Sequence, residues 1–297
     1  MYRDCSLILE GGGMRGVYTG GILEYFMEKN LYFPYVIGVS AGACNAMSYL
    51  SRQKGRNKKI TVDLAGDKRY MRKMGIIDGS GFFNMDFLFD EIPNQLIRYD
   101  YERFRETEEK LVVVVTDCKT GKPIYLDVTK DHGNEEICTM LRATSSLPLI
   151  APVVRYKGME LLDGGLSDSI PIEKAISEGY NKNIVILTRN KGYRKEQTRS
   201  LPIYKLLYSK KYAGAIKGLE NRYKVYNQSL DLVERLAEKG LVYPIYPSEQ
   251  INVSRVEKDK GKLEYLYQLG YHDGEAHYNN IIEYLIEVDN EQKRKEQ

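Results

Sequence analysis

Tryptophan is absent from this 297-residue chain, cysteine and histidine are scarce, and long uncharged apolar runs are missing. Four cysteines without a C-x-x-C pair need no disulfide framework in a chain of this size, so we expect reduced thiols. The first residues lack the apolar core of a secretory signal, and no stretch approaches the roughly 18 apolar residues of a membrane span. These absences predict a cytoplasmic protein.

Charge is nearly balanced overall, with 44 basic and 41 acidic residues, but it is unevenly placed. Residues 51–59 carry five positive charges and no acid, and residues 189–211 carry eight basic residues against the single acid Glu196. Such runs form either solvated loops or contacts with an anionic surface. We therefore expect exposed loops or peripheral contact with an anionic membrane. Neither run belongs to a recognisable nucleic-acid-binding module, so no nucleic-acid partner is expected.

The pattern of apolar residues predicts an α/β fold. In the first sixty residues strand and helix patterns alternate: strands over 6–10 and 35–38, helices over 14–30 and 41–50. Further strands are predicted over 111–116, 124–128 and 183–188, with a helix over 135–143 and a hairpin over 153–162 that turns at Lys157 and Gly158. This order predicts a mainly parallel sheet with helices on its faces.

Beyond residue 200 the apolar residues recur at helical spacing. Helices are predicted over 205–239 and 263–288, the second with a break at Gly270. We therefore divide the chain into an α/β unit over 1–200, a mainly helical part over 201–288 that completes the fold, and a charged, fraying tail over 289–297.

A candidate nucleophile lies in the G-x-S-x-G motif formed by Gly38, Val39, Ser40, Ala41 and Gly42. The motif directly follows a predicted strand and precedes a predicted helix. A serine on such a tight turn is held exposed in a strained backbone conformation, and the flanking glycines keep the turn free of side chains. This context makes Ser40 the candidate catalytic serine.

A second glycine-rich turn lies between the first strand and helix and consists of Gly11, Gly12, Gly13, Met14, Arg15 and Gly16. Successive amides of this loop can bind the oxyanion of a tetrahedral intermediate. The same spacing fits a dinucleotide-binding fingerprint, but that site needs an acid at the end of the second strand, and none occurs between Glu28 and Asp63. No G-K-[ST] follows a glycine-rich turn, which excludes a Walker-type phosphate loop.

The candidate base for Ser40 is either a histidine or an aspartate. The chain has three histidines, and Ser40, Asp163 and then His272 or His277 would give the chain order of an α/β-hydrolase triad. Asp163 itself ends a predicted strand and precedes Gly164 and Gly165. A carboxylate there faces the ligand crevice, and in a dry site with a raised pKa it can accept the serine proton directly.

Together these motifs resemble the oxyanion loop, nucleophile elbow and DGA/DGG motif of patatin-like phospholipases. The segment 142–148 (RATSSLP) also resembles that family's A-S-x-A-x-P stretch, with Ser146 in place of a small apolar residue. The resemblance covers about residues 6–190. It implies a three-layer α/β/α sandwich and a Ser40–Asp163 dyad that uses neither histidine nor any metal or cofactor.

The resemblance and the chemistry of the motifs predict a lipid acyl hydrolase of the phospholipase A or lysophospholipase type. Arg15 is expected to hold the glycine loop or a lipid phosphate. The aromatic segment 82–89 is expected to pack in the core, line an acyl channel or form a lid, and the 25 tyrosines would suit an interfacial surface. Two alternatives remain: a carboxylesterase or thioesterase acting on small acyl esters, and a non-catalytic lipid-binding protein.

Overall fold

The computed structural model describes residues 4–72, 81–148, 150–199, 201–208 and 211–295. Its strands are β1 (Cys5–Leu9), β2 (Tyr35–Val39), β3 (Lys110–Asp117), β4 (Pro123–Val128), β5 (Val154–Tyr156), β6 (Met159–Asp163), β7 (Lys182–Ile186) and β8 (Val242–Ile245). Its α-helices are α1 (Val17–Glu28), α2 (Ala41–Leu50), α3 (Arg56–Lys58), α4 (Tyr101–Glu106), α5 (Asn134–Thr144), α6 (Ile172–Ser177), α7 (Leu201–Tyr208), α8 (Ala213–Glu238) and α9 (Lys260–Lys295). Short 3₁₀ turns form η1 (Gly13–Gly16) and η5 (Gly164–Leu166), and π-helical segments form η2 (Lys59–Asp63) and η4 (Phe87–Leu96).

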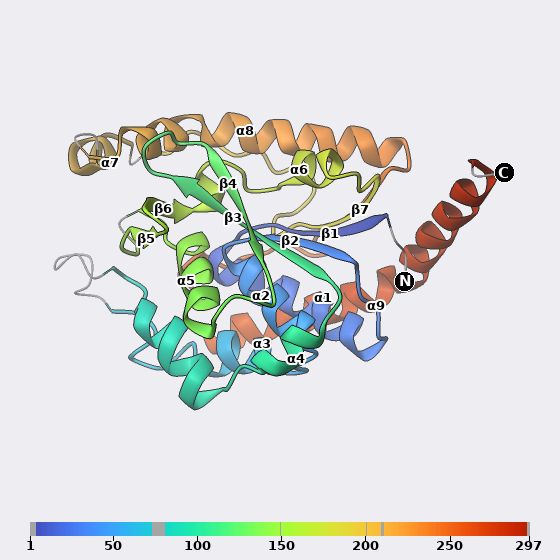
Figure 1. Ribbon diagram of the computed structural model, residues 1–297, viewed down its shortest axis with the longest axis horizontal. Helices are drawn as coiled ribbons and strands as arrows, with labels where there is room; N and C mark the ends of the chain where they lie inside the picture. Colours follow the sequence, from blue (N-terminus) through green and yellow to red (C-terminus); the bar gives the residue numbers. More distant parts are fainter. Residues whose placement is uncertain (1–3, 73–80, 149, 200, 209–210, 296–297) are drawn as a thin grey trace.

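The eight strands within the described ranges form one mixed sheet, in the order β5-β6-β3-β2-β1-β7-β8 with β4 also paired to β3. Strands β3, β2, β1, β7 and β8 pair in parallel, whereas β4, β5 and β6 add antiparallel pairs at one side. Helices α6 and α8 cover one face of the sheet, and α1, α2 and α9 cover the other (Figure 1). The predicted three-layer α/β/α sandwich is therefore confirmed.

The central strands are buried on both faces, as their unbroken apolar sequences predict. On β1, Leu7 and Leu9 pack in the core that contains α1, α2 and α9. Ile8 points the opposite way and packs with side chains of α6 and α8. Because successive side chains of a strand alternate between faces, each central strand contributes to two cores at once. This double burial holds the carboxyl ends of β1, β2 and β3 at one edge of the sheet.

The helix break predicted at Gly270 is wrong, because α9 runs through this residue without interruption. A Cβ atom at Gly270 would lie 2.1 Å from the Tyr18 carbonyl oxygen, and one at Gly21 would lie 2.1 Å from the Tyr267 carbonyl oxygen. Glycines on α1 and α9 thus let the two backbones meet where any side chain would collide. Gly270 therefore permits close contact between α1 and α9 and does not end the helix.

The part predicted as mainly helical also contains a strand that the pattern did not indicate. Strand β8 pairs in parallel with β7 at the edge of the sheet. It contains Pro244, which lacks an amide donor and is tolerated in an edge strand but argues against a central one. The charged segment that begins at residue 289 continues α9, which ends at Lys295.

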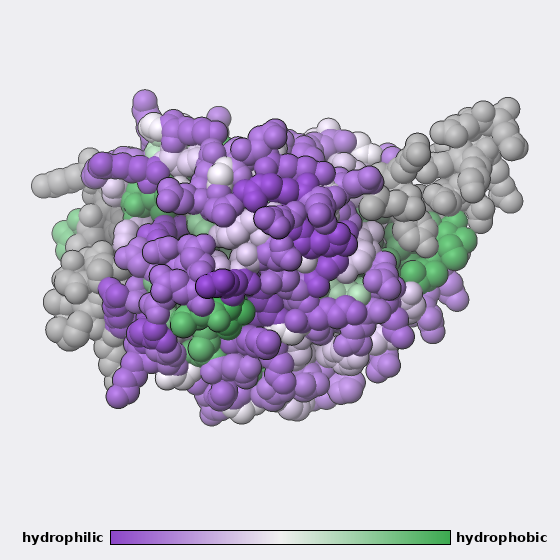
Figure 2. Space-filling view, turned by 60° about the horizontal axis from the view of Figure 1, so that its bottom comes forward, coloured by the Kyte–Doolittle hydropathy of each residue, from purple (hydrophilic) through white to green (hydrophobic). Residues whose placement is uncertain are grey.

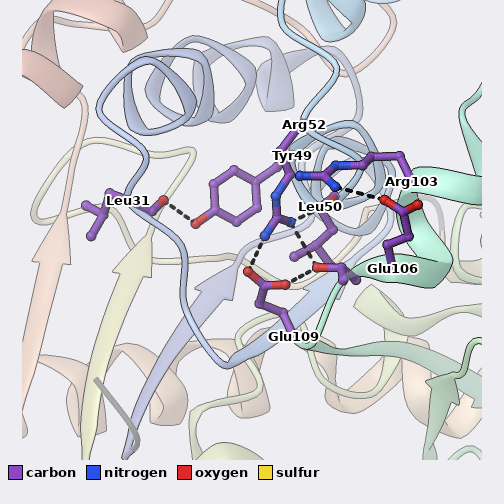
Figure 3. A network of polar contacts seen from close by, with 8 residues as sticks. Leu31, Tyr49, Leu50, Arg52, Arg103, Glu106 and Glu109 are labelled. Atoms are coloured by element: carbon purple, nitrogen blue, oxygen red, sulfur yellow. Dashed lines mark hydrogen bonds and ion pairs between the residues drawn. The ribbon is translucent and has the colours of Figure 1, made fainter. Parts of the chain in front are cut away.

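Most cations of the basic run 51–59 are turned toward the protein. Arg52 forms an ion pair with Glu109 and donates a 2.5 Å hydrogen bond to the Leu50 carbonyl oxygen (Figure 3). Arg56 is 8% exposed and donates to the Ser48 hydroxyl at 3.1 Å. Lys58 pairs with Glu264 at 2.7 Å. These three cations therefore have partners within the fold, whereas Lys54 and Lys59 of the same run are exposed.

The face of the molecule seen in Figure 2 is mostly hydrophilic, with separate hydrophobic patches. Among the helices that the described ranges contain, none is both long enough and apolar enough to span a bilayer.

We predict that Gly270→Ala lowers the free energy of unfolding by about 3 kcal/mol, because the new methyl group would force α1 and α9 apart. Chemical denaturation of the variant and the wild type measures this difference. Gly261→Ala is the matched control on the same helix. A Cβ there meets only the flexible Asp259 carboxylate at 3.3 Å, so this variant should be neutral or slightly more stable. Equal effects of the two substitutions would contradict the close-contact explanation.

Candidate active site

Ser40 lies in the sharp turn between β2 and α2. Its backbone has φ 53° and ψ −124°, in the sparsely populated region that the G-x-S-x-G pattern predicts. The Ser40 amide donates a 2.9 Å hydrogen bond to the Thr144 hydroxyl, which in turn donates to the Val114 carbonyl oxygen at 2.5 Å. The strained turn is therefore fixed by β3 and by the end of α5. Ser40 is 8% exposed, so its hydroxyl lies at the bottom of a depression.

The glycines on either side of Ser40 are required by close backbone contacts. A Cβ at Gly42 would lie 2.5 Å from the Leu9 carbonyl oxygen, at the end of β1. A Cβ at Gly38 would lie 2.7 Å from the Ala43 backbone, inside the turn. Both distances are shorter than a side chain permits. The motif thus brings the nucleophile turn against the end of the neighbouring strand.

Asp163 ends β6 and is 2% exposed. Its Oδ1 accepts a 2.7 Å hydrogen bond from the Gly165 amide, while its Oδ2 accepts none from the described residues. Burial raises the pKa of Asp163, and the nearby Ser40 hydroxyl and the Arg222 charge partly oppose this rise. An unpaired carboxylate oxygen with a raised pKa beside a serine hydroxyl is suited to accept a proton.

The segment 142–148 contacts both members of the candidate dyad. Thr144 holds the Ser40 amide, and the Ser146 carbonyl oxygen accepts a 2.9 Å hydrogen bond from the Asp163 amide. The Ser146 hydroxyl turns away and donates to the Arg142 carbonyl oxygen at 2.8 Å. Sequence reasoning singled out this stretch by resemblance but missed the role of Thr144. The only sequence signal for the role of Thr144 was its position within the segment 142–148.

The glycine loop that follows β1 lies beside Ser40. A Cβ at Gly11 would lie 3.2 Å from the Ser40 Cβ. The Met14 amide, however, donates a 3.1 Å hydrogen bond to the Arg255 carbonyl oxygen, so it already has a partner. Within the described part of the chain, the amides of Gly11, Gly12 and Gly13 bond to no backbone carbonyl. These amides therefore remain available as hydrogen-bond donors beside Ser40, a smaller set than the whole loop.

The three histidines have partners elsewhere. The His277 ring lies 2.7 Å from the Tyr243 hydroxyl, His272 is exposed beside Glu275, and His132 lies against Thr129. None of them lines the cavity at Ser40. No cluster of three or more His, Cys, Asp or Glu positioned to hold a metal occurs among the described residues.

An apolar cavity of about 160 Å³ opens next to Ser40. The aromatic segment 82–89 divides its side chains between two roles: Phe87 is 1% exposed in the core, whereas Phe83, Leu88 and Phe89 line the cavity. Cys44 and Cys138 also line it. Burial raises the pKa of Cys44 to about 11, so its thiol stays protonated at neutral pH. An apolar cavity with few polar groups beside a nucleophile suits an acyl chain.

Comparison with known families agrees with this geometry. The model of the patatin-like phospholipase family matches residues 7–176, which is more than half of the chain. The chain belongs to the patatin-like phospholipase family. A second model, described as a domain of unknown function (DUF6363), matches residues 212–286 of this patatin-like protein.

Two curated relatives match the patatin-like region. The uncharacterized protein YjjU of Escherichia coli K12 is 27% identical over 187 residues, covering 62% of this chain and 51% of the relative. The probable lipid hydrolase 463L of invertebrate iridescent virus 6 is 28% identical over 198 residues, covering 60% of this chain and 65% of the relative. The matched regions thus span between half and two thirds of each relative's length.

Among solved structures, VipD from Legionella pneumophila shares the fold. The TM-score is 0.50 at 13% sequence identity, and the superposition covers 96% of this chain and 67% of VipD. At this identity the likeness establishes the architecture only. It supports the patatin-like arrangement of the sheet and its helices.

We predict that Asp163→Asn raises the melting temperature at pH 8. The raised pKa of Asp163 means that its charged form disfavours the native state, and the neutral amide removes this effect. The gain should be present above the raised pKa and should vanish as pH falls below it, because the wild-type carboxyl is then protonated too. Thermal unfolding at pH 8 measures the gain in melting temperature, and thermal unfolding at acidic pH measures its loss. Asp131→Asn, at an exposed position, is the control and should change nothing. A lower melting temperature for Asp163→Asn at pH 8 would contradict the prediction.

Proposed function

We propose that this protein is a lipid acyl hydrolase in which Ser40 is the nucleophile and Asp163 the base. The observation that carries the proposal is the combination of a strained serine, a carboxylate oxygen without a hydrogen bond and an apolar cavity at one strand edge. Family membership and the printed name of the viral relative, a probable lipid hydrolase, support the same class of reaction.

In the first step, Asp163 Oδ2 accepts the proton of Ser40 as Oγ attacks the ester carbonyl carbon. The carbonyl oxygen becomes an oxyanion, which the free amides of Gly12 and Gly13 bind, assisted by the positive end of the adjoining α2. Collapse of this intermediate breaks the ester bond. Asp163 then returns the proton to the departing alkoxide, and the acyl group remains on Ser40.

In the second step, water attacks the acyl-serine carbonyl and gives a proton to Asp163. The same two amides bind the second oxyanion. Its collapse releases the fatty acid and restores the Ser40 hydroxyl with the proton from Asp163. Because the base must be ionised, the activity should fall as pH falls through the raised pKa of Asp163.

We predict that Ser40→Ala and Asp163→Asn each lower kcat by at least about 1,000-fold, since each removes a group that acts in both steps. The measurement is hydrolysis of a panel of phospholipids, lysophospholipids and short p-nitrophenyl esters. His272→Ala/His277→Ala is the control variant and should retain full activity, because both histidines lie outside the cavity.

Loss of activity in a folded histidine variant would overturn the dyad in favour of a triad. Activity confined to short esters or thioesters would point to the alternative of a soluble carboxylesterase or thioesterase. Equal lipid binding by wild type and Ser40→Ala without any turnover would favour a lipid-binding protein.

We also propose peripheral contact with anionic membranes through residues 189–211. Lys191 and Arg199 are exposed there, and Ile203 and Leu206 on α7 are 54% and 82% exposed. Exposed cations beside exposed apolar side chains are the combination that favours binding at a lipid interface.

We predict that Lys191→Gln/Arg199→Gln weakens binding to anionic vesicles about 30-fold at low salt, as measured by sedimentation, because each cation near the surface contributes roughly 1 kcal/mol. Lys54→Gln/Lys59→Gln removes two exposed cations from the run 51–59 and serves as the control. Binding that depends on neither lipid charge nor salt would refute the proposal.

A further inference from the structure

Five cationic side chains gather at the strand edge that carries the candidate dyad. This cationic cluster consists of Arg15, Arg189, Lys195, Arg222 and Arg255. Arg15 lies within electrostatic reach of Arg189 and Arg255, and Lys195 lies within reach of Arg15, Arg222 and Arg255. The members come from the glycine loop, the segment after β7, helix α8 and the segment before α9.

The cationic cluster carries more charge than the nearby carboxylates can balance, since Glu10 and Asp163 are the acids whose charges act on its members. Within the described part of the chain, none of its five members forms an ion pair with a carboxylate. Arg15 is only 4% exposed, and its Nε and the Nε of Arg189 have no hydrogen-bond partner among the described residues. A buried cation without a partner is costly by several kcal/mol. The excess positive charge of the cationic cluster therefore favours the binding of an anion that the described residues do not supply.

The two nearest carboxylates are already engaged. Glu10 Oε1 accepts a hydrogen bond from the Tyr226 hydroxyl at 2.8 Å, and its Oε2 accepts bonds from the amide and hydroxyl of Thr188 at 2.6 and 3.0 Å. Asp163 accepts the Gly165 amide, and the nearby Ser40 hydroxyl also favours its charged form. These two carboxylates can balance at most two of the five positive charges in the cluster.

Three members of the cluster contact the catalytic loops or their supports. Arg222 Nε donates to the Gly165 carbonyl oxygen at 2.5 Å, two residues after Asp163. Arg255 accepts the Met14 amide through its carbonyl oxygen and lines the apolar cavity together with Ser40. Lys195 Nζ lies 3.9 Å from the ring centre of Tyr226, whose hydroxyl binds Glu10. The cationic cluster thus adjoins the Asp163 turn through Arg222 and the apolar cavity beside Ser40 through Arg255.

We propose that Lys195, Arg222 and Arg255 bind a phosphate group that the acyl-ester substrate carries close to its scissile bond. This proposal rests on the acyl hydrolase function proposed above and names its substrate class. With the acyl chain in the apolar cavity and the ester at Ser40, a phosphate a few bonds from the ester comes within reach of the cationic cluster. Arg15 adds a guanidinium whose Nε has no hydrogen-bond partner among the described residues.

Phosphate suits the cationic cluster better than carboxylate does. A phosphate ester offers two or three terminal oxygens and one or two negative charges, so it can accept hydrogen bonds from several guanidinium and ammonium groups at once. Burial and the charges of Arg222 and Arg255 lower the pKa of Lys195 to about 6. A bound phosphate would oppose this effect and favour the protonated, hydrogen-bonding form of Lys195.

The test compares two soluble substrates with the same short acyl chain, 1-acylglycerol 3-phosphate and the uncharged 1-monoacylglycerol. Wild type should show a kcat/KM at least about 100-fold higher for the phosphate ester. In Lys195→Gln/Arg255→Gln this preference should largely disappear, at about tenfold for each lost cation, because kcat/KM falls far more for the phosphate ester than for the uncharged ester. Arg222 is left intact because its Nε also holds the Gly165 turn.

Lys191→Gln is the matched control, since it removes one positive charge from an exposed position of the same segment. It should keep the wild-type preference. A second measurement does not depend on turnover: inorganic phosphate should raise the melting temperature of the wild type and of Lys191→Gln but not that of the double variant.

The outcomes separate this proposal from the one on which it rests. Equal kcat/KM for both esters in wild type, without any stabilisation by phosphate, would overturn the phosphate site and leave the hydrolase intact. A phosphate-dependent rise in melting temperature together with equal kcat/KM would show a site for free phosphate and refute the substrate assignment. An equal loss for both esters in the double variant would show a structural role instead. Hydrolysis of neither ester, with no stabilisation by phosphate, would overturn both proposals.

Discussion

The candidate site depends on backbone approaches that are closer than any side chain allows. Gly42 meets the end of β1, and a Cβ at Gly164 would lie 2.2 Å from the Val114 carbonyl oxygen of β3. Gly16 meets Ala41 in the same way, with a Cβ separation of 2.7 Å. These contacts bring the turns after β1, β2 and β6 together at one edge of the sheet. Ser40, Asp163 and the amides of the glycine loop can converge there because the glycines leave room for them.

Much of this arrangement could be predicted because it is local in sequence. The helix predicted over 41–50 matches α2, and the turn predicted at Lys157 and Gly158 separates β5 from β6. Both follow from short patterns of apolar residues and glycines. The residues proposed for the dyad also lie in short motifs, and the structure brings Ser40 and Asp163 together as those motifs imply.

The features that could not be predicted depend on contacts between distant segments. From its local sequence, Gly270 is expected to end a helix. Its actual reason is a close backbone contact with Tyr18, which lies more than 250 residues earlier in the chain. Strand β8 could not be predicted because Pro244 argues against a strand. The proline is tolerated because β8 lies at the edge of the sheet, where its missing amide leaves no neighbouring strand unpaired. The basic run 51–59 reads as solvated, whereas Arg52 reaches Glu109 on another segment (Figure 3). Local spacing carries no information about such partners.

The C-terminal part contributes to the candidate site as well as to the fold. Arg222 and Arg255 lie outside the region that matches the patatin-like model and inside the region that matches the domain of unknown function. The carbonyl oxygen of Arg255 holds the Met14 amide, and a Cβ at Gly13 would lie 2.7 Å from that same oxygen. Gly13 has φ 58°, so the loop takes a shape that a larger residue would resist and that the Arg255 backbone helps to fix. The glycine loop is therefore shaped by a segment about 240 residues later in the chain, which makes the C-terminal part a structural requirement for the proposed chemistry.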